Sequence, residues 1–278
     1  MADPTISIII PTAGDNPLLD ECLASIKKLH YPPEQIQTVV ITNQDLHKAG
    51  KEFSFAASVN HAARKAKGAY LYITNDDIVL RPDTVRAWVD AVREFPNTIL
   101  GAKIRDKDTN KPLAPGYTMS LWTGIAKPVF TSNIPTPCDW VSGCALFLSR
   151  RIWNKLKGFD EGFAPGYFED FDLCLRAKKA RVNCLLWPSA EVLHAETTTF
   201  NRNKPKKYEY WYRNKIRFLT KQASPLQLAT ALTLQYALFT PARAIVKRDG
   251  RLLPALKGLH WNIRQLSNTL ASRRKMRT

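Results

Sequence analysis

A cluster of carboxylates follows a loop of glycines and aromatic residues in the middle of the chain. Residues 158–168 form this loop, and Glu169, Asp170 and Asp172 come directly after it. Because such a loop can carry a carboxylate into a cleft, Asp170 is our candidate general base, with Glu169 as the second candidate. The same acids can instead complement the dipole of a helix that they open. For Asp172 we favour a structural pairing with Arg176, one helical turn later.

An acid and an imidazole end two further apolar runs. Asp77 follows a run that begins at Tyr70, and His194 follows Val192 and Leu193. A carboxylate, diphosphate oxygens and water suit Mg²⁺ or Mn²⁺, and an imidazole favours Mn²⁺. We therefore expect Asp77 and His194 to hold one divalent cation. Two plainer interpretations stay open: the acids after Tyr70 only form a turn, and His194 is an ordinary, partly buried histidine.

Apolar runs alternate with helical periodicity over the first hundred residues. The predicted strands are 6–10, 38–42, 69–75 and 98–103, and the predicted helices are 18–29, 55–67 and one that begins at Pro82. This alternation predicts an α/β fold with a mostly parallel sheet flanked by helices. Ligands of such sheets bind beyond the carboxyl ends of the strands, where Thr12, Asn43 and Asp77 fall.

Two local patterns refine this prediction. If the third strand continues through Asn75, then Asn75 and Asp77 point to one face and Asp76 to the other. Residues 105–137 are rich in Pro and Thr and predict an irregular segment ahead of a strand over 140–149. In that strand Gly143 would admit a ligand close to the backbone.

The charge of the chain is concentrated near its C-terminus. Of the formal net charge of +17, +16 belongs to residues 201–278, which hold 18 Lys and Arg against 2 Asp and Glu. A near-neutral body is thus followed by a module suited to an acidic partner. The uncharged stretch 222–242 contains Gln, Thr and Pro, which argue against a membrane span. Amphipathic helices lying on an anionic membrane fit this pattern best.

Two other interpretations of the basic tail stay open. It can fold back on the body as a helical cap with a solvated basic face. It can also bind nucleic acid, with bases stacked on aromatic residues among the Lys and Arg side chains, namely Tyr208, Tyr210, Trp211 and Tyr212.

The cysteines and the N-terminus indicate a compartment. The 5 cysteines are odd in number and form no CxxC pair, which favours buried, reduced thiols in a reducing cytosol. The first residues lack the basic and apolar regions of a signal peptide. We expect a cytoplasmic protein that associates with the inner face of the cell membrane.

Seven short motifs follow one another along the chain. They are Ile8-Ile9-Ile10-Pro11-Thr12, Phe55-Ala56-Ala57-Ser58-Val59-Asn60 with Lys67-Gly68, Asn75-Asp76-Asp77, Val141-Ser142-Gly143, Phe159-Asp160-Glu161, Glu169-Asp170-Phe171-Asp172-Leu173 and His194. In this order they resemble family 2 of the nucleotide-sugar glycosyltransferases, especially its rhamnosyltransferase-like branch. The resemblance covers about residues 5–220, including Tyr212-Arg213-Asn214.

The resemblance implies a GT-A fold and an inverting, metal-dependent sugar transfer to a hydroxyl of a cell-envelope or lipid-linked glycan. Asp77 and His194 would hold Mn²⁺ or Mg²⁺ on the diphosphate of a UDP- or dTDP-linked donor, and Asp170 would be the base. The expected organisation is a catalytic domain over 1–205, with a nucleotide half to 104, and a membrane-associating extension over 206–278. The residues implied for the nucleotide pocket are Pro11, Thr12, Asn43, Asn60, Arg64, Asp76 and Gly143.

The chain departs from the family pattern at two positions. Thr42 precedes Asn43 where the family usually has an Asp, so the acidic contact to the nucleoside is missing unless Asp45 replaces it. Asn75 also stands where many members have an acid. Two alternative functions follow: a nucleic-acid-binding protein that uses the basic aromatic tail, and a non-catalytic relative that binds sugar nucleotides.

Overall fold

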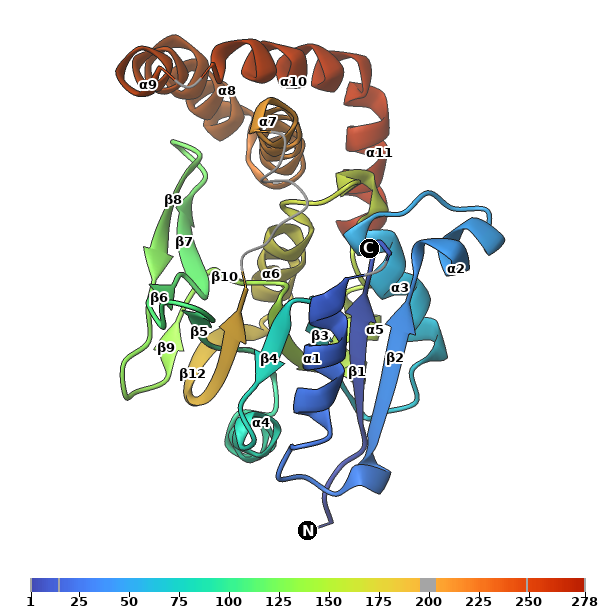
Figure 1. Ribbon diagram of the computed structural model, residues 1–278. Helices are drawn as coiled ribbons and strands as arrows, with labels where there is room; N and C mark the ends of the chain where they lie inside the picture. Colours follow the sequence, from blue (N-terminus) through green and yellow to red (C-terminus); the bar gives the residue numbers. More distant parts are fainter. Residues whose placement is uncertain (1, 15, 196–203, 249, 278) are drawn as a thin grey trace.

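The computed structural model describes residues 2–14, 16–195, 204–248 and 250–277. Its centre is a nine-stranded mixed sheet in which the main strands follow the order β2-β1-β3-β11-β5-β12-β4 (Figure 1). The strands of this path are β1 (Ile6–Pro11), β2 (Ile36–Ile41), β3 (Tyr70–Thr74), β4 (Ile78–Leu80), β5 (Thr98–Asp106), β11 (Ala145–Ser149) and β12 (Asn183–His194).

Most of these strands run in one direction, as the alternation of elements predicts. β1 pairs in parallel with β2 and β3, and β12 pairs in parallel with β5. β11 lies between β3 and β5 and runs against both, and β4 runs against β12. The sheet is therefore mostly parallel with two reversed strands, and the carboxyl ends of β1 and β3 lie at one edge.

Helices cover both faces of the sheet and bury an apolar core on each. α1 (Pro17–Ile26) and α4 (Thr84–Glu94) pack on one face with Ile8 and Ile10 of β1. α3 (Phe55–Lys65), α5 (Arg150–Lys155) and α6 (Glu169–Lys179) pack on the other with Ile9. The buried strand β1 thus contributes side chains to both cores, because successive side chains point to opposite faces of the sheet. Short helices follow at η1 (Pro33–Gln35), α2 (Asn43–Lys48) and η2 (Glu161–Phe163).

Two predicted strands end earlier or break. β3 ends at Thr74, and residues 75–77 form a turn into β4, so the assignment of Asn75 and Asp76 to opposite strand faces is wrong. The strand predicted over 140–149 is divided into β10 (Trp140–Val141) and β11, with Gly143 in the break. The break frees the backbone N–H of Gly143 for a side chain.

The segment predicted to be irregular forms strands instead. β7 (Gly116–Ser120) and β8 (Ile125–Val129) make a hairpin that pairs with β10 in a three-stranded sheet. β6 (Pro112–Leu113) and β9 (Thr136–Pro137) join the large sheet at β5 and β12. The strand pattern of this segment was obscured because its strands are short and because β6, β8 and β9 each contain a proline, which is tolerated in edge strands.

The rest of the described chain is helical and lies at one end of the body (Figure 1). The elements are α7 (Lys204–Gln222), α8 (Pro225–Thr233), the π-helical η3 (Leu234–Phe239), α9 (Thr240–Lys247), α10 (Leu252–Arg264) and α11 (Leu266–Arg277). α7 lies between the body and the outer helices. Among the described helices, none combines the length and apolarity needed to cross a membrane. The 5 cysteines form no disulfide, and Cys22, Cys144, Cys174 and Cys184 are buried, as expected.

The face of α7 toward the body carries charged side chains that are buried in ion pairs. Asp160 accepts from Arg217 Nη2 at 3.0 Å and Lys221 Nζ at 2.7 Å, and Lys221 also lies 2.8 Å from Asp172. Arg176 Nε donates to Asp172 at 2.9 Å, which confirms the structural pairing expected for Asp172. The predicted boundary at 205/206 falls within the first turn of α7, a helix that is fastened to the body by these ion pairs.

Candidate active site

A cavity of about 400 Å³ opens at the edge of the sheet where β3 ends, and we call it the catalytic cavity. Its lining combines residues from the turn after β3, the break before β11, the start of α6 and the end of β12. Among the lining residues are Asn75, Gly143, Glu169, Asp170 and His194. Five positions singled out from the sequence thus surround one space.

Asp170 is held on the wall of this cavity by two backbone donors. The N–H of Gly143 donates to Oδ2 at 2.9 Å, and the N–H of Phe171 donates to Oδ1 at 2.8 Å. A side chain at position 143 would crowd this carboxylate, because a Cβ there would lie 3.3 Å from Oδ2. Burial raises the pKa of Asp170 to about 6, and the two backbone hydrogen bonds oppose that rise. Asp170 is therefore ionised at neutral pH.

Glu169 lies beside it in a different electrostatic state. Burial, and then the adjacent charge of Asp170, raise the pKa of Glu169 well above its usual value. Its Oε2 is buried without a hydrogen-bond partner among the described residues. Both carboxylates are positioned by a left-handed turn at Tyr167 and Phe168, which have φ values of 77° and 73°. The two neighbouring acids thus differ in environment: two backbone N–H groups stabilise the charge of Asp170, whereas burial and the adjacent charge favour the protonated form of Glu169.

The structure also brings Asp77 and His194 together. His194 Nε2 lies 3.1 Å from Asp77 Oδ1, and both side chains are largely buried. The contact lacks hydrogen-bond geometry, and neither atom has another partner among the described residues. The pair forms because the end of β12 is paired in antiparallel register with β4, which directly follows Asp77.

These two atoms fit a shared divalent cation. Two ligands of an octahedral ion, each about 2.1 Å from it and at right angles, lie about 3 Å apart. A carboxylate oxygen and an imidazole nitrogen are donors that Mn²⁺ accepts. In the described ranges, no cluster of three or more His, Cys, Asp or Glu side chains completes a protein-only site. The pair thus suits a cation whose other ligands come from a bound anion and water.

The residues expected in the nucleotide pocket are more dispersed. Pro11 and Thr12 are buried at the end of β1, and Thr12 Oγ1 donates to the carbonyl of Gly14 at 2.9 Å. Asn43 is exposed at the start of α2, and Arg64 is exposed on α3. Asp76 is half-buried in the turn after β3. Their contact with a nucleotide stays a prediction.

Two side chains near this pocket are already engaged. Asp45 accepts from the N–H and Oγ1 of Thr42 in a capping box at the start of α2, at 2.9 and 2.7 Å. Asn60 donates to the carbonyl of Phe159 at 2.9 Å and accepts from the N–H of Phe159 at 2.9 Å. Asn60 therefore positions the loop ahead of the carboxylates, whatever else it contacts.

Sequence reasoning missed the part that α7 plays in the site. Asn214 is fully buried, and its Nδ2 donates to the carbonyls of Phe163, Gly166 and Tyr167 at 2.6, 2.7 and 3.2 Å. These carbonyls belong to the loop that delivers Glu169 and Asp170. The available signal was the spacing of Asn214, Arg217 and Lys221, which places three polar side chains on one helical face.

Residues 25–231 match the family described as "Glycosyltransferase like family 2". The N-acetylglucosaminyl-diphospho-decaprenol L-rhamnosyltransferases of two Mycobacterium tuberculosis strains, CDC 1551 / Oshkosh and ATCC 25618 / H37Rv, are each 28% identical over 152 residues. That match covers 48% of this chain and 49% of each relative, so the chain spans about half the length of these curated relatives.

Solved structures match a larger share of the chain at lower identity. GalNAc-T7 with UDP, GalNAc and Mn²⁺ superposes with a TM-score of 0.66 at 14% identity, covering 97% of this chain and 57% of that one. Staphylococcus aureus TarS 1-349 gives a TM-score of 0.57 at 13% identity, covering 91% and 79%. These likenesses confirm the fold predicted from the sequence, which is that of the GT-A glycosyltransferases.

Proposed function

The chain belongs to glycosyltransferase like family 2, and from this premise we propose that it moves a sugar from a nucleoside-diphosphate sugar to a glycan hydroxyl with inversion at the anomeric carbon. One observation carries the proposal. An ionised carboxylate, Asp170, lines the same cavity as His194, whose Nε2 lies 3.1 Å from Asp77. A base and an anion-anchoring site in one cavity are what a single displacement requires.

In the proposed reaction, Asp170 accepts the proton of the acceptor hydroxyl as that oxygen attacks the anomeric carbon. The bond from this carbon to the diphosphate oxygen breaks, and nucleoside diphosphate leaves from the opposite face. The N–H groups of Gly143 and Phe171 hold the carboxylate in position. Burial and the charge of Asp170 raise the pKa of Glu169 well above its usual value, which favours the protonated form, and in that form Glu169 can donate a hydrogen bond to a sugar hydroxyl.

Asp77 and His194 would hold Mn²⁺ or Mg²⁺, which when bound supplies positive charge for the departing diphosphate. His194 lines the catalytic cavity, so this charge would face the space in which the donor binds. Pro11, Thr12, Asn43, Arg64 and Asp76 are proposed to surround the nucleotide. Asn60 and Gly143 complete this proposed set, and the amide of Asn60 also holds Phe159 in place.

The proposed acceptor is a lipid-linked or cell-envelope glycan, and the proposed sugar is rhamnose or another hexose carried on UDP or dTDP. The support is the activity of the mycobacterial relatives, which are named as rhamnosyltransferases acting on N-acetylglucosaminyl-diphospho-decaprenol. A peripheral position at the cytoplasmic side of a membrane is part of this proposal. Exposed apolar and basic side chains on the C-terminal helices support it.

The test is a screen of nucleotide sugars for release of nucleoside diphosphate in the presence of Mn²⁺, with Asp170→Asn as the key variant. We expect the variant to retain donor binding and to lose transfer by about 10²–10⁴-fold, the usual contribution of a positioned base. Calorimetry with the donor separates binding from transfer. A variant as active as the wild type would remove Asp170 from the proposed role.

The cation site has a readout that does not need turnover. Manganese bound in the presence of nucleoside diphosphate is measured by the loss of the free Mn²⁺ paramagnetic resonance signal. We expect Asp77→Ala to weaken Mn²⁺ binding by about 10-fold or more, since it removes a direct ligand of the kind that Mn²⁺ prefers. Asp90→Ala is the matched control, because Asp90 lies on the exposed face of α4 and pairs with Arg93. Equal Mn²⁺ affinity in Asp77→Ala and wild type would contradict the assignment.

A further inference from the structure

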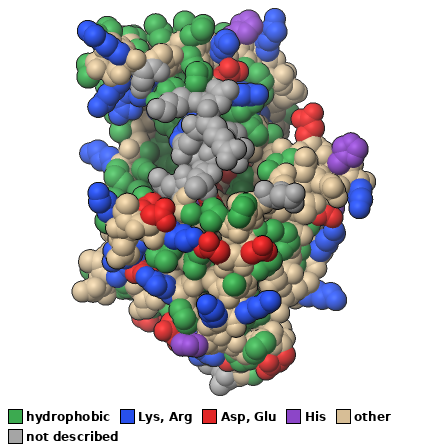
Figure 2. Space-filling model, in the orientation of Figure 1, with side chains coloured by type: hydrophobic (Ala, Val, Ile, Leu, Met, Phe, Trp, Pro, Cys, Tyr) green, Lys and Arg blue, Asp and Glu red, His purple; other side chains and the backbone are tan. Residues whose placement is uncertain are grey.

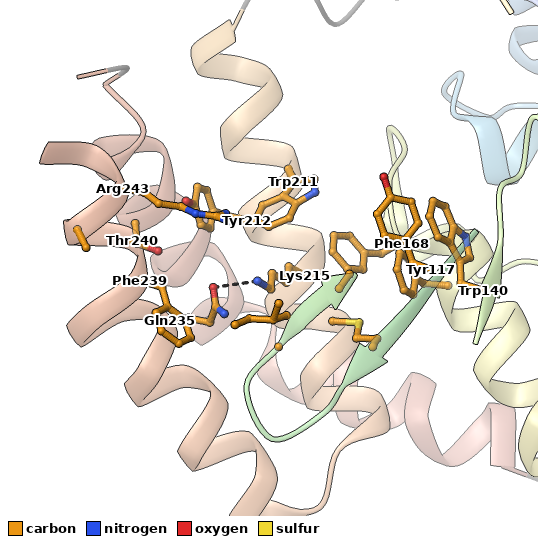
Figure 3. A pocket seen from close by; sticks show the side chains of 16 residues that line it. Tyr117, Trp140, Phe168, Trp211, Tyr212, Lys215, Gln235, Phe239, Thr240 and Arg243 are labelled. Atoms are coloured by element: carbon orange, nitrogen blue, oxygen red, sulfur yellow. Dashed lines mark hydrogen bonds between the residues drawn. The ribbon is translucent and has the colours of Figure 1, made fainter. Parts of the chain in front are cut away.

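A second cavity, of about 420 Å³, lies where the C-terminal helices meet the body, and we call it the junction cavity (Figure 3). Its walls come from the hairpin β7–β8, from α7 and from the segment η3–α9. The lining is mostly apolar and aromatic, with Lys215 among these side chains and Arg243 opposite it on α9.

The junction cavity adjoins the catalytic cavity across a shared aromatic wall. The ring centroids of Trp140 and Phe171 are stacked 4.2 Å apart, and those of Phe168 and Trp211 lie 5.8 Å apart. The residues that line both cavities are Tyr117, Trp140, Phe168, Phe171 and Trp211. The two cavities therefore lie on either side of one aromatic wall.

Lys215 is a buried cation without an acidic partner. The residue is 6% exposed, and in the described part of the chain it forms no ion pair with a carboxylate. Its Nζ donates to Gln235 Oε1 at 2.8 Å and lies 4.7 Å from the centroid of the Trp211 ring. Burial, and then the charge of Arg243, lower the pKa of Lys215 to about 7. The charged form of Lys215 is thus disfavoured until an anion approaches.

The neighbours of Lys215 are fixed in place. Gln235 donates through Nε2 to the carbonyl of Thr123 at 2.6 Å, so its Oε1 stays directed at the lysine. Gly124 follows Thr123 at the tip of the hairpin with a φ of 63°, and a Cβ there would lie 3.3 Å from Cε of Lys215. An ammonium group has three N–H donors, and Gln235 takes one of them.

Lys215 differs from Lys221, which is also buried on α7, because Lys215 has no acidic partner among the described residues. Lys221 is also buried, but it contacts both Asp160 and Asp172 and is fully compensated. A buried charge is normally paired because desolvation is costly. The absence of an acid at Lys215 points to a ligand that brings the negative charge.

We propose that the junction cavity binds the diphosphate linkage of an amphiphilic acceptor, with the anion on Lys215. This inference rests on the proposed function, and it extends that function to a defined acceptor site. The sugar end would pass the aromatic wall toward Asp170. The hydrocarbon end would leave past Phe239 and Thr240, next to the exposed apolar residues Ile245 and Val246 of α9. Arg243 at this side adds a second positive charge.

The test measures binding of farnesyl diphosphate by calorimetry in metal-free buffer, so that no sugar transfer and no cation are required. We expect Lys215→Met to weaken binding by about 10-fold or more, because a charged hydrogen bond is lost. Lys127→Met is the matched control: Lys127 is exposed on β8 of the same hairpin and should leave binding unchanged. Farnesol should bind at least about 10-fold more weakly than farnesyl diphosphate.

A second measurement uses the wild-type chain and does not depend on how a variant folds. Reductive methylation followed by peptide mass spectrometry reports the accessibility of each lysine. Farnesyl diphosphate should protect Lys215 and leave Lys127 modified. Absence of protection, or equal affinity in Lys215→Met and wild type, would overturn the proposal.

Inorganic diphosphate distinguishes the two sources of the anion. If it binds as tightly as farnesyl diphosphate and depends equally on Lys215, the cavity takes a free anion and the lipid assignment is wrong. If the lipid probe binds through Lys215 while no nucleotide sugar is turned over, the acceptor site stands and the proposed transfer fails. The two proposals can therefore fail separately.

Discussion

At the scale of single residues, Asp170 and Glu169 show how one helix start gives two adjacent acids different environments. Asp170 receives N–H groups from Gly143 and Phe171, which stabilise its charge. Glu169 has an oxygen with no such partner among the described residues and lies next to a negative charge. Since like charges this close disfavour double ionisation, the pKa of Glu169 is raised well above its usual value.

This difference predicts the pH dependence of activity. A base must be deprotonated, so kcat/KM should be constant above about pH 7 and fall about tenfold per unit below the pKa of Asp170, which burial raises to about 6. Glu169→Gln mimics the protonated acid and should keep this acidic limb and most of the activity. Steady-state kinetics from about pH 5 to about pH 9 provide the check, because this range begins about one unit below the pKa of Asp170.

Two outcomes would contradict this assignment. An acidic limb near pH 4 in the wild type would mean that Asp170 is not the titrating group. An inactive Glu169→Gln together with an active Asp170→Asn would exchange the two roles.

At the scale of elements, α7 connects the C-terminal helices to the chemistry. On its buried face, Asn214 donates to carbonyls of the loop over residues 158–168, and Arg217 and Lys221 donate to Asp160. Ser272 of α11 reaches the same Asp160 oxygen at 2.8 Å. Helices separated by fifty residues thus meet on one carboxylate of the loop that precedes the active site.

Loss of that carboxylate should destabilise the fold. Asp160→Asn leaves Arg217 without its buried acid and reduces the compensation of Lys221, so we expect a loss of about 3–5 kcal/mol in the free energy of unfolding. Asp90→Asn is the control: Asp90 pairs with Arg93 on an exposed helix face, and its loss should cost less than about 1 kcal/mol. Urea titration measures both.

The same carboxylate gives stability a pH dependence. Burial acts to raise the pKa of Asp160, but the charges of Lys221 and Arg217 outweigh burial and hold this pKa below its usual value. The contribution of Asp160 is therefore complete above about pH 4 and is lost as the pH falls toward its folded pKa. Wild type and Asp160→Asn should converge in stability in acid; a difference that persists unchanged at low pH would exclude the ionic explanation.

At the scale of the whole molecule, the basic tail divides into an inner and an outer part. Arg217 and Lys221 are used inside the protein, whereas Lys247, Arg248, Lys257 and Arg264 are exposed. Figure 2 shows basic and hydrophobic side chains interspersed over the C-terminal helices at the top of the view. The exposed apolar residues there include Leu226, Leu238, Ile245, Val246, Leu252, Leu253, Leu256, Ile263 and Leu266.

This outer surface predicts salt-sensitive binding to anionic membranes. We expect full-length protein to float with phosphatidylglycerol vesicles at low salt and to bind less as salt rises, because screening acts over about 8–10 Å. Replacing Ile245 and Val246, which are 74% and 76% exposed, by Asn should reduce flotation. Ile134→Asn is the control, since Ile134 is 69% exposed but lies between β8 and β9.

Point variants suit this test better than truncation, because removal of the tail would also expose Asp160. Flotation that does not depend on lipid charge, or that the Ile134 variant reduces equally, would reject the membrane surface.

The aromatic residues that suggested nucleic-acid stacking make contacts within the protein. Trp211 and Tyr212 line the junction cavity, and Arg213 lies over the rings of Tyr210 and Trp261.

The sequence by itself determined the features that depend on local pattern. The alternation of apolar runs predicted the parallel strands, and the order of short motifs predicted the family. Five positions in those motifs, Asn75, Gly143, Glu169, Asp170 and His194, line the catalytic cavity. Residue type alone indicated that Asp77 and His194 suit one cation, because a carboxylate and an imidazole are metal ligands in any fold. The pairing of Asp172 with Arg176 followed from helical spacing.

Tertiary structure decided what depends on contacts between distant segments. No local signal is strong enough to predict the insertion of β11 between β3 and β5 or the hairpin β7–β8. The same holds for the contact of Asn214 with the loop over residues 158–168. The ionisation of Glu169 and Asp170 could not be assigned from their positions in the sequence. A pKa is set by burial and by hydrogen-bond donors such as Gly143, which lies 27 positions away. Lys215 and Lys221 look alike in the sequence, and only the folded chain shows that one is compensated by two acids while the other lacks one.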